Sequence, residues 1–300
     1  MRNASRDWLW PYLGIGVAWG CSFLFIKESL GFLTPFGVAF LRCALGGTTL
    51  VIIARARGLR LPRDVVVWAH LLVIAMCINV LPGILFAVAE TRTTSILAGI
   101  INAMTPITSL FFIAVVFRDE RITRQQVAGL VIGALGVAVV LGLWRGLGAN
   151  PWWAVAALLV SVTLYGLSFP YTRRFISTRG IAPVSLASAQ LLTATVILAP
   201  SFMFDGLNGH RATLGGAASI VGLGVLGSGL AFMWNFRVIA DAGSQVASTV
   251  TYLTPVVAVI VGVSLLHESL TWYEPLGGVI VLVGAALGQG RFRRRHTLRS

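Results

Sequence analysis

The most constraining feature of the sequence is a series of long apolar runs that contain almost no charge. Residues 65–89, 93–117 and 243–266 are examples, and each is long enough to cross a hydrocarbon core of about 30 Å. Of the 300 residues, 57% are hydrophobic and 11% are charged, whereas a soluble domain has about 25% charged residues. So few charges cannot cover a water-soluble surface, and the chain is therefore predicted to be an integral membrane protein.

Apolar length, interrupted by glycine, proline and charge, predicts ten transmembrane helices and an all-α fold. The first span is interpreted as a retained helix rather than a signal peptide, because no small-residue cleavage site follows it. An even number of spans places both chain termini on one side of the membrane. The predicted spans are residues 9–28, 35–54, 65–89, 93–117, 124–143, 152–171, 182–203, 213–236, 244–266 and 272–290.

The basic residues support this topology independently of hydropathy. Most of the 23 Lys and Arg residues fall in loops on the side of the termini, and the opposite side carries Lys27, Arg92, Arg145 and Arg211. Loops rich in Lys and Arg are typically cytoplasmic. Both termini are therefore predicted to be cytoplasmic, in a multi-pass protein of a bacterial inner membrane. The net charge of +13 is assigned to topology, and no nucleic-acid partner is expected.

The chain contains an internal repeat, with residues 1–148 as the first half and residues 149–290 as the second. Residues 291–300 are a basic tail, predicted to be cytoplasmic. Five helices per half is an odd number, so the second half enters the membrane from the opposite face. Inverted repeats of this kind let transporters open one central cavity alternately to each side. The matching segments are Trp19-Gly20-Cys21-Ser22-Phe23 with Tyr165-Gly166-Leu167-Ser168-Phe169, Met104-Thr105-Pro106 with Leu253-Thr254-Pro255, and Glu120 with Glu268 before a Gly-rich last helix.

These features resemble the EamA family of the drug/metabolite transporter superfamily over nearly the whole chain. The resemblance implies ten helices, a central cavity between the halves, and export or exchange of amino acids, related metabolites or drugs. It rests on the run from Ala18 to Phe23 leading to Lys27, on Thr34-Pro35 followed by Leu41-Arg42, on Leu253-Thr254-Pro255, and on Glu268 before a Gly-rich helix.

Arg42 is the most unusual residue, because it lies within the second predicted span. Charged groups inside a span are costly unless they are paired or face water. Two interpretations stay open. Arg42 reaches outward and pairs with Glu28 or Glu90, or Arg42, helped by Lys27, holds a substrate carboxylate or closes an outer gate by ion pairing.

Two prolines near the centres of the fourth and ninth spans predict breaks in those helices. Pro106 and Pro255 each disturb the hydrogen bond to the carbonyl four residues earlier, which belongs to Asn102 and to Thr251. Each break is expected to bind polar ligand atoms or to act as a hinge. The alternative is a kink shaped for packing and healed by the Asn or Thr side chain.

Similar loosened segments are predicted in the third and eighth spans. Asn79 is followed by Pro82 and a glycine, and Ser228 lies at the matching place between two glycines. Asn79 is placed in the substrate pathway and Pro82 among the hinge residues. Close helix packing through small residues is the alternative.

Aromatic and hydroxyl side chains predict one wall of the pathway. Trp19 and Tyr165 occupy matching positions near mid-membrane. One turn further on lie Ser22 and Phe23 in the first half, and Ser168 and Phe169 in the second. Such a wall suits an aromatic or amphipathic solute, and packing against lipid or other helices is the alternative. Weaker additions to the pathway are Trp234, Asn235 and Tyr252.

The acidic residues lie at or near the ends of the predicted spans. This leaves no isolated mid-membrane carboxylate of the kind that proton relays employ. Facilitated diffusion or exchange is therefore favoured over obligatory proton coupling. Glu28, Glu90 and Glu268 are the candidates for ion pairing or proton coupling.

The sequence favours a transporter over two other classes, a lipid-modifying membrane enzyme and a channel. An enzyme would need clustered carboxylates, a metal motif, or a nucleophile with a base, and the four histidines are scattered. No phosphate-binding loop and no CxxC pair occurs, so no catalytic residue, metal or cofactor is expected. A channel stays open as an alternative. The predicted partners are a small-molecule substrate and the lipid bilayer, while the glycines suit contacts within one bundle and between subunits equally.

Overall fold

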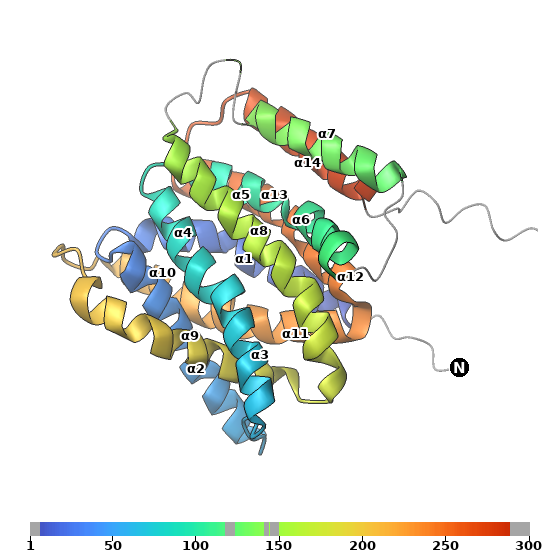
Figure 1. Ribbon diagram of the computed structural model, residues 1–300. Coiled ribbons are helices and arrows are strands. Elements are labelled where there is room, and N and C mark those ends of the chain that lie inside the picture. Colours follow the sequence, from blue (N-terminus) through green and yellow to red (C-terminus); the bar gives the residue numbers. More distant parts are fainter. Residues whose placement is uncertain (1–6, 118–123, 141–143, 145–149, 289–300) are drawn as a thin grey trace, which may run out of the picture.

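The computed structural model describes residues 7–117, 124–140, 144 and 150–288, and within them the fold is all-α (Figure 1). Two short apolar helices, Val127–Val140 and Tyr273–Gly284, accompany eight helical segments long and apolar enough to cross a membrane. Each predicted span coincides with one of these segments, so the predicted multi-spanning all-α fold is confirmed. The eight are Leu9–Ser29, Pro35–Ala56, Val65–Glu90, Ser95–Phe117, Trp152–Arg179, Pro183–Asp205, Leu214–Ala242 and Val246–Leu265.

In the first half, the third and fourth spans are broken into shorter helical pieces, while the other spans are continuous. The third span passes through the π-helical segment η1, and the fourth is interrupted between α5 and α6. The elements are α1 (Leu9–Ser29), α2 (Pro35–Ala56), α3 (Val65–Ala75), η1 (Met76–Val80), α4 (Leu81–Glu90), α5 (Ser95–Asn102), α6 (Thr105–Phe112), the π-helical η2 (Ile113–Phe117) and α7 (Arg124–Val140).

The second half breaks at the same two places. Its third span contains the π-helical segment η4, and its fourth span contains the 3₁₀ segment η5. The elements are α8 (Trp152–Phe175), the 3₁₀ turn η3 (Ser177–Arg179), α9 (Pro183–Asp205), α10 (Leu214–Gly222), η4 (Leu223–Leu230), α11 (Ala231–Ala242), α12 (Ser244–Ser248), η5 (Thr249–Tyr252), α13 (Thr254–Leu265) and α14 (Tyr273–Gly288).

Helix starts follow from local chemistry. Thr34 caps α2 by accepting a hydrogen bond from the Gly37 amide at 3.1 Å, and Pro35 occupies the first turn. Asp64 caps α3 in the same way through the Val66 amide, at 2.8 Å. Capping satisfies amide groups that a helix start leaves without partners, and proline lacks the amide that the first turn does not need.

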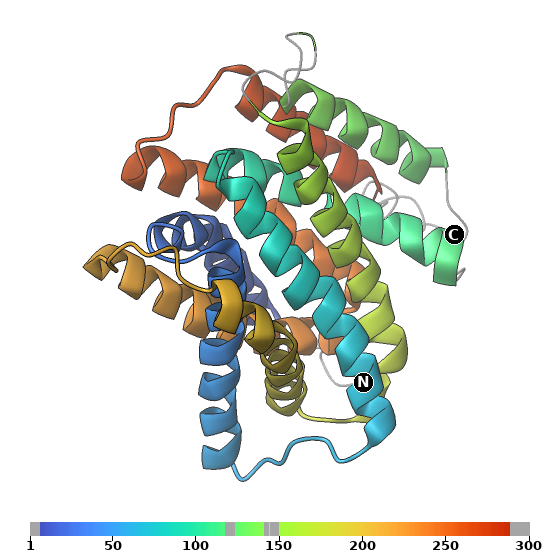
Figure 2. The same cartoon turned by 60° about the vertical axis from the view of Figure 1, so that its left-hand side comes forward.

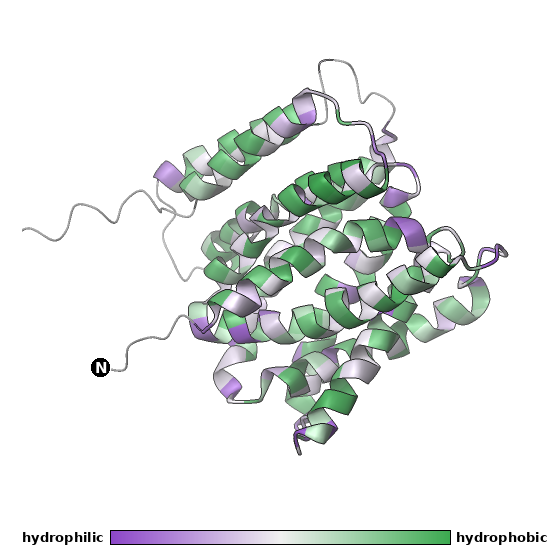
Figure 3. Ribbon diagram, turned by 180° about the vertical axis from the view of Figure 1, so that it is seen from behind, coloured by the Kyte–Doolittle hydropathy of each residue, from purple (hydrophilic) through white to green (hydrophobic). Residues whose placement is uncertain are grey.

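The helices consist mainly of apolar residues along their length, and polar residues gather at their ends and in the loops, as Figure 3 shows. Large apolar side chains are exposed midway along spans, for example Val17 on α1, 56% exposed, and Val196 on α9, 72% exposed. An exposed apolar area of this extent marks a membrane interaction surface. The fold is therefore a bundle whose outer face meets lipid.

Helices α7 and α14, the last of each half, lie side by side at the edge of the bundle (Figure 1, green and red). Glycines allow the close approach. A Cβ atom at Gly277 would lie 2.5 Å from the Val140 amide nitrogen, and one at Gly136 would lie 2.6 Å from that of Val281. Small residues permit this kind of backbone contact between membrane helices. The remaining spans surround the interior of the bundle, where α2 and α9 also lie side by side (Figure 2).

Candidate functional site

A cavity lies between the two halves, next to the places where the spans break. The first half contributes α1, α2, η1, α4 and α5 to its wall, and the second contributes α8, α11 and η5. The free space open to the centres of water-sized molecules is about 40 Å³, enough for a few waters. A metabolite cannot fit without a rearrangement. The lining residues are Trp19, Ser22, Phe23, Ile26, Arg42, Ile78, Phe86, Asn102, Tyr165, Phe169, Phe232 and Thr251.

Among the described residues that line the cavity, Arg42 alone is charged. It is 4% exposed, and its Nε donates a hydrogen bond to Ser228 Oγ at 3.0 Å. Gly46, one turn further along α2, lets this helix meet η4, because a Cβ there would lie 2.7 Å from the Gly224 carbonyl oxygen.

The terminal amino groups of the Arg42 guanidinium have no protein partner in the described part of the chain, where Ser228 is the only hydrogen-bond partner of this side chain. Arg42 forms no ion pair with Glu28 or Glu90, both of which the structure describes. A buried charge without a counter-charge is costly. The cavity therefore offers the two free amino groups to an anion, in the fork geometry that suits a carboxylate.

The position equivalent to Arg42 in the second half is Gln190 on α9, counted from the prolines that start each helix, Pro35 and Pro183. Gln190 Nε2 donates a hydrogen bond to Asn79 Oδ1 in η1. Asn79 is in turn the repeat equivalent of Ser228. Each half thus uses its second helix to hold the π-helical segment of the other half, and π-helical segments in α-helices are frequent at functional sites.

The remaining lining is mainly aromatic. Phe86 lies between Phe23 and Tyr165, with ring centroids 5.7 Å away in each case. On the other side, Trp19 meets Phe232 edge-on at 5.8 Å and donates from Nε1 to the Gly227 carbonyl oxygen at 3.1 Å. Such rings offer a large apolar contact area. The cavity is therefore suited to an amphipathic solute with one anionic end.

The two helix breaks meet at the cavity. Thr105 and Thr254, the residues before the two prolines, donate from Oγ1 to the carbonyl oxygens of Asn102 and Thr251, each at 2.8 Å. Asn102 Nδ2 also donates to Thr254 Oγ1 at 3.2 Å, which links the two breaks directly. The hydroxyl of the preceding threonine, rather than the Asn or Thr side chain at the break, satisfies each of these carbonyls.

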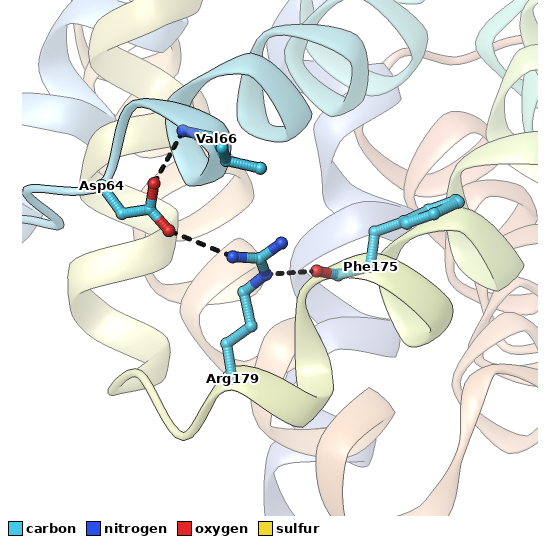
Figure 4. A network of polar contacts seen from close by, with 4 residues as sticks. All are labelled: Asp64, Val66, Phe175 and Arg179. Atoms are coloured by element: carbon cyan, nitrogen blue, oxygen red, sulfur yellow. Dashed lines mark hydrogen bonds and ion pairs between the residues drawn. The ribbon is translucent and has the colours of Figure 1, made fainter.

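Both faces of the bundle are closed by contacts between the halves. On the terminus face, formed by loops 57–64 and 176–182, Arg179 Nη1 donates to Asp64 Oδ2 at 3.2 Å (Figure 4). Arg179 Nε also donates to the Phe175 carbonyl oxygen at 2.8 Å. Deeper on the same side, His70 Nδ1 and the Tyr171 hydroxyl share a hydrogen bond of 2.8 Å.

On the opposite face, the equivalent loops 30–34 and 206–213 meet through their backbones. Leu33 and Leu207 form an antiparallel β-bridge, and the Thr34 amide donates to the Gly206 carbonyl oxygen at 3.2 Å. Asn208 Nδ2 adds a bond to the Leu30 carbonyl oxygen at 3.0 Å. The equivalent loops are therefore joined by a side-chain ion pair on the terminus face and mainly by backbone hydrogen bonds on the opposite face.

A second, open pocket of about 440 Å³ lies beside these loops on the opposite face, and it is called the vestibule below. Lys27 Nζ donates to the carbonyl oxygens of Glu90 and Thr93, each at 2.8 Å, so Lys27 caps the end of α4 instead of reaching the cavity. The vestibule is lined by Lys27, Leu30, Gly31, Leu33, Thr34, Pro35, Glu90, Thr91 and Asn208.

The predicted pathway residues divide into two groups. The cavity brings together Trp19, Ser22, Phe23, Arg42, Asn102, Tyr165 and Thr251. It does not include Lys27, Asn79, Ser168, Trp234, Asn235 or Tyr252.

The residues outside the cavity have other neighbours. Ser168 Oγ donates to the Tyr165 carbonyl oxygen at 2.7 Å, and Trp234 packs against the buried cluster that contains Ile15 and Val238. Tyr252 packs against the group formed by Ala103, Val137 and Val281. Asn235 is 5% exposed.

The three prolines predicted as hinges each lie in the first turn of the helix after a break, in α4 for Pro82, α6 for Pro106 and α13 for Pro255. In that position a proline removes no hydrogen bond from its own helix.

The candidate acidic residues have three different environments. Glu28 is exposed. Glu268 accepts hydrogen bonds from the Ser95 amide at 3.0 Å, the Ser95 hydroxyl at 2.8 Å and the Ile96 amide at 3.2 Å, which is a cap for the start of α5. Glu90 is buried at the end of α4. Glu120, the repeat equivalent of Glu268, lies outside the described residues.

Sequence reasoning missed several residues of the site. Phe86 and Phe232 line the cavity but look like any other phenylalanine of an apolar run. Gln190, which holds η1 beside the cavity, can be found from the sequence, because the internal repeat aligns it with Arg42. Phe169, the repeat equivalent of Phe23, lies on the aromatic wall that the sequence predicts, and it does line the cavity.

The chain matches the model of the EamA-like transporter family twice, over residues 8–142 and 152–288. A solved crystal structure has the same fold, with a TM-score of 0.71 and 18% identity, covering 96% of this chain and 99% of that one.

Curated relatives of similar length are named as transporters. One, an "Uncharacterized transporter" from Archaeoglobus fulgidus, is 28% identical over 92% of this chain and 96% of its own length. A "Probable terminal-alkyne amino-acid exporter" from Streptantibioticus cattleyicolor is 28% identical over 93% of this chain and 90% of its own length. The "Uncharacterized inner membrane transporter YedA" of Escherichia coli is 25% identical over 92% of this chain and 89% of its own length.

Proposed function

The chain belongs to the EamA-like transporter family, and on that premise we propose that it exports or exchanges small amphipathic carboxylates, such as amino acids and related metabolites. Transport proceeds by alternating access to the cavity between the halves. No catalytic chemistry is part of this proposal. The chain acts as a carrier.

The observation that carries the proposal is the environment of Arg42. This side chain is 4% exposed and lines the cavity, and one of its nitrogens, Nε, donates a hydrogen bond to Ser228. A carboxylate that binds the remaining two amino groups supplies the counter-charge that the protein does not. A charge-assisted hydrogen bond contributes about 1.5–3 kcal/mol, enough to select anionic solutes.

The aromatic residues supply the second part of the specificity. Phe23, Phe86 and Tyr165 form a continuous row on one side of the cavity, and an apolar side chain of the solute would pack against it. One relative is named as a probable exporter of an amino acid with a terminal alkyne. That name supports an amphipathic amino acid or a similar carboxylate as the solute class for this chain.

The closure of both faces supports the proposal of alternating access. The cavity holds only a few waters, the Asp64–Arg179 ion pair spans the terminus face, and the Leu33–Leu207 bridge spans the opposite face. We take this conformation as an occluded one. Loading or release requires one closure to open while the other stays shut.

The described basic residues support an inner-membrane orientation with both termini in the cytoplasm. On the terminus face, Arg55 lies in the last turn of α2 and is followed by Arg57, Arg60 and Arg63. Arg173, Arg174 and Arg179 cluster at the end of α8. The described bases of the opposite face are Lys27, Arg92 and Arg211. This bias is the one that places a face in the cytoplasm.

Counterflow in proteoliposomes tests the proposed function with three related probes. Radiolabelled L-phenylalanine has a carboxylate and an ammonium group, phenylacetate has only the carboxylate, and phenethylamine has only the amine. We expect saturable, trans-stimulated uptake of the first two probes and none of the third. Arg42→Gln is expected to lower the apparent affinity for both carboxylates by about 10- to 100-fold.

Three results would count against the proposal. Equal uptake of phenethylamine would show that a carboxylate is not what the cavity selects. Flux that never saturates and shows no trans-stimulation would indicate a channel. Normal uptake of both carboxylates by Arg42→Gln and Arg42→Lys would remove Arg42 from the site.

A further inference from the structure

Glu90 is a buried carboxyl group that the fold does not account for. It ends α4, is 0% exposed, and neither of its carboxyl oxygens has a hydrogen-bond partner. Buried polar groups in proteins are almost always hydrogen-bonded, and an ionised carboxylate without a partner is especially costly. Glu268, by contrast, uses its carboxylate fully as the cap of α5.

The internal repeat shows that no carboxyl group is needed at this place. Counting back without a gap from Pro106 and Pro255, Glu90 aligns with Ile239 on α11. Ile239 is 1% exposed, so an apolar side chain fills the equivalent position. The local scaffold is also the same in the two halves. Arg173 donates to the carbonyl oxygens of Ile239 and Ala240, at 3.1 and 3.0 Å, as Lys27 does to those of Glu90 and Thr93.

Glu90 borders the vestibule, which is open to solvent on the opposite face, but its side chain is 0% exposed in this conformation. The charged groups whose fields reach it are Lys27, Glu268 and Arg42. Lys27 comes from α1, Arg42 from α2 and Glu268 from the loop after α13. None of the three forms an ion pair with the Glu90 carboxyl group in this conformation, and Lys27 is held by backbone carbonyl oxygens.

We propose that Glu90 is a proton-binding site that is loaded and emptied through the vestibule and makes transport depend on the pH at the opposite face. This inference rests on the proposed function. In the occluded conformation the carboxyl group carries a proton, which removes the charge that no neighbour compensates. When the opposite face opens, the proton passes from the carboxyl group to a vestibule water, and the resulting carboxylate faces Lys27 in a hydrated surrounding. Binding of a proton from water reverses the step.

Infrared spectroscopy of the purified protein in lipid tests the site without any transported solute. The carbonyl stretch of a protonated carboxyl group is compared at neutral pH in the wild type, in Glu90→Gln and in Glu90→Ile. We expect a protonated-carboxyl band in the wild type that disappears in both variants and, in the wild type, disappears on raising the pH. Glu90→Ile is expected to fold normally, because Ile239 fills the equivalent place.

Glu268→Gln is the matched control. It should keep the band while lowering the thermal stability, because the cap of α5 weakens. The absence of a protonated-carboxyl band in the wild type, or a band that survives both replacements of Glu90, would overturn the proposal.

A second measurement tests the pH dependence with L-phenylalanine. Counterflow in wild-type proteoliposomes is expected to change several-fold when the pH at the opposite face is varied across the range in which the infrared band disappears. In Glu90→Gln this pH dependence should be lost. If Glu90→Gln instead blocks counterflow of L-phenylalanine but not of phenylacetate, Glu90 binds the ammonium group of the solute and the proton site is refuted.

The two measurements separate the failure of this inference from failure of the proposed function. If no probe is carried, the proposed function fails, while the infrared band still shows whether Glu90 holds a proton. If the band is missing while counterflow is saturable, the proposed carrier function is supported and the proton site at Glu90 is refuted.

Discussion

Two equivalent hydrogen-bonded pairs of side chains connect the two halves, and only one of the two pairs contains a charged residue. Arg42 bonds Ser228 and lines the cavity, whereas Gln190 bonds Asn79 and does not line it. Gln190 is 1% and Asn79 is 0% exposed. The comparison teaches that the inter-half contact itself needs only a neutral hydrogen bond. The charge of Arg42 is an addition for which the fold has no use.

The same division recurs at the ends of the third spans. Lys27 and Arg173 cap α4 and α11 through the same kind of carbonyl contacts, so the architecture is shared. Glu90 replaces the apolar Ile239 in the first half alone. The first half thus carries both ionisable groups, while the second half has a neutral residue at each equivalent position.

The largest expected effect, on carboxylate affinity, comes from replacing Arg42 by the residue at the equivalent position, so that both inter-half pairs are neutral. Arg42→Gln gives the first half the residue of the second, which can still bond Ser228 but has no charge. We expect a loss of about 10- to 100-fold in carboxylate affinity, because one charge-assisted contact disappears. Counterflow of L-phenylalanine over a range of concentrations measures this.

Gln190→Ala is the control for that substitution. It leaves Asn79 without its partner and is expected to lower stability by about 1–3 kcal/mol while carboxylate binding persists. Thermal unfolding of the purified protein measures the first effect. A variant of Gln190 that loses affinity as severely as Arg42→Gln would mean that the two pairs act alike and that charge is not the difference.

The two Thr-Pro breaks provide a smaller contrast. Thr254 makes two hydrogen bonds, one to Thr251 and one from Asn102 of the other half, whereas Thr105 bonds only within its own break. Thr254→Val should therefore cost about 2 kcal/mol of stability and Thr105→Val about 1 kcal/mol. Unfolding curves of the two variants check the order, and equal costs would argue against the link between the breaks.

A third contrast lies in the cavity wall. Trp19 and Tyr165 are repeat equivalents, but Trp19 bonds the Gly227 carbonyl of the other half, while the Tyr165 hydroxyl has no bond to a described residue. Trp19→Phe should lose about 1 kcal/mol of stability. Tyr165→Phe should stay within about 0.5 kcal/mol of the wild type. Thermal unfolding distinguishes them, and a larger loss for Tyr165→Phe would reverse the assignment.

The smallest effect is expected at the two closures. Asp64→Asn keeps the cap on α3, since Asn caps helices well, but removes the ion pair with Arg179, which is worth about 0.2–1 kcal/mol at a surface. Labelling of a cysteine introduced at Thr251 by an impermeant thiol reagent should rise a few-fold from the terminus face.

Asn208→Ala is the counterpart on the opposite face. The backbone bonds between loops 30–34 and 206–213 remain in this variant, so labelling from that face should stay near the wild-type rate. A larger increase for Asn208→Ala than for Asp64→Asn would show that the backbone closure is the weaker of the two.

Much of this architecture is predictable from sequence, for physical reasons. Hydrocarbon thickness fixes the length of each span, so apolar runs alone locate the helices. Arg42 stands out because a charge in an apolar run is rare. The Thr-Pro pairs mark the breaks in the fourth and ninth spans, since proline cannot continue the backbone ladder.

Other features leave no readable mark. Phe86 lines the cavity and Phe111 is 47% exposed on the outer surface, yet both lie in apolar runs, where hydropathy does not distinguish cavity from lipid. The partner of Trp19 is a backbone carbonyl, which no side-chain pattern encodes. The burial of Glu90 is equally hidden, because its place at a span end suggests contact with water.

The pairing of Arg42 with Ser228 also imposes an order on biogenesis. The two residues are 186 positions apart, so α2 enters the bilayer long before its partner is synthesised. A central arginine opposes insertion by about 2.5–3.5 kcal/mol, and the apolar remainder of α2 must outweigh this alone. The first half is therefore inserted while Arg42 still lacks its partner, and the Arg42–Ser228 contact forms only when the eighth span arrives.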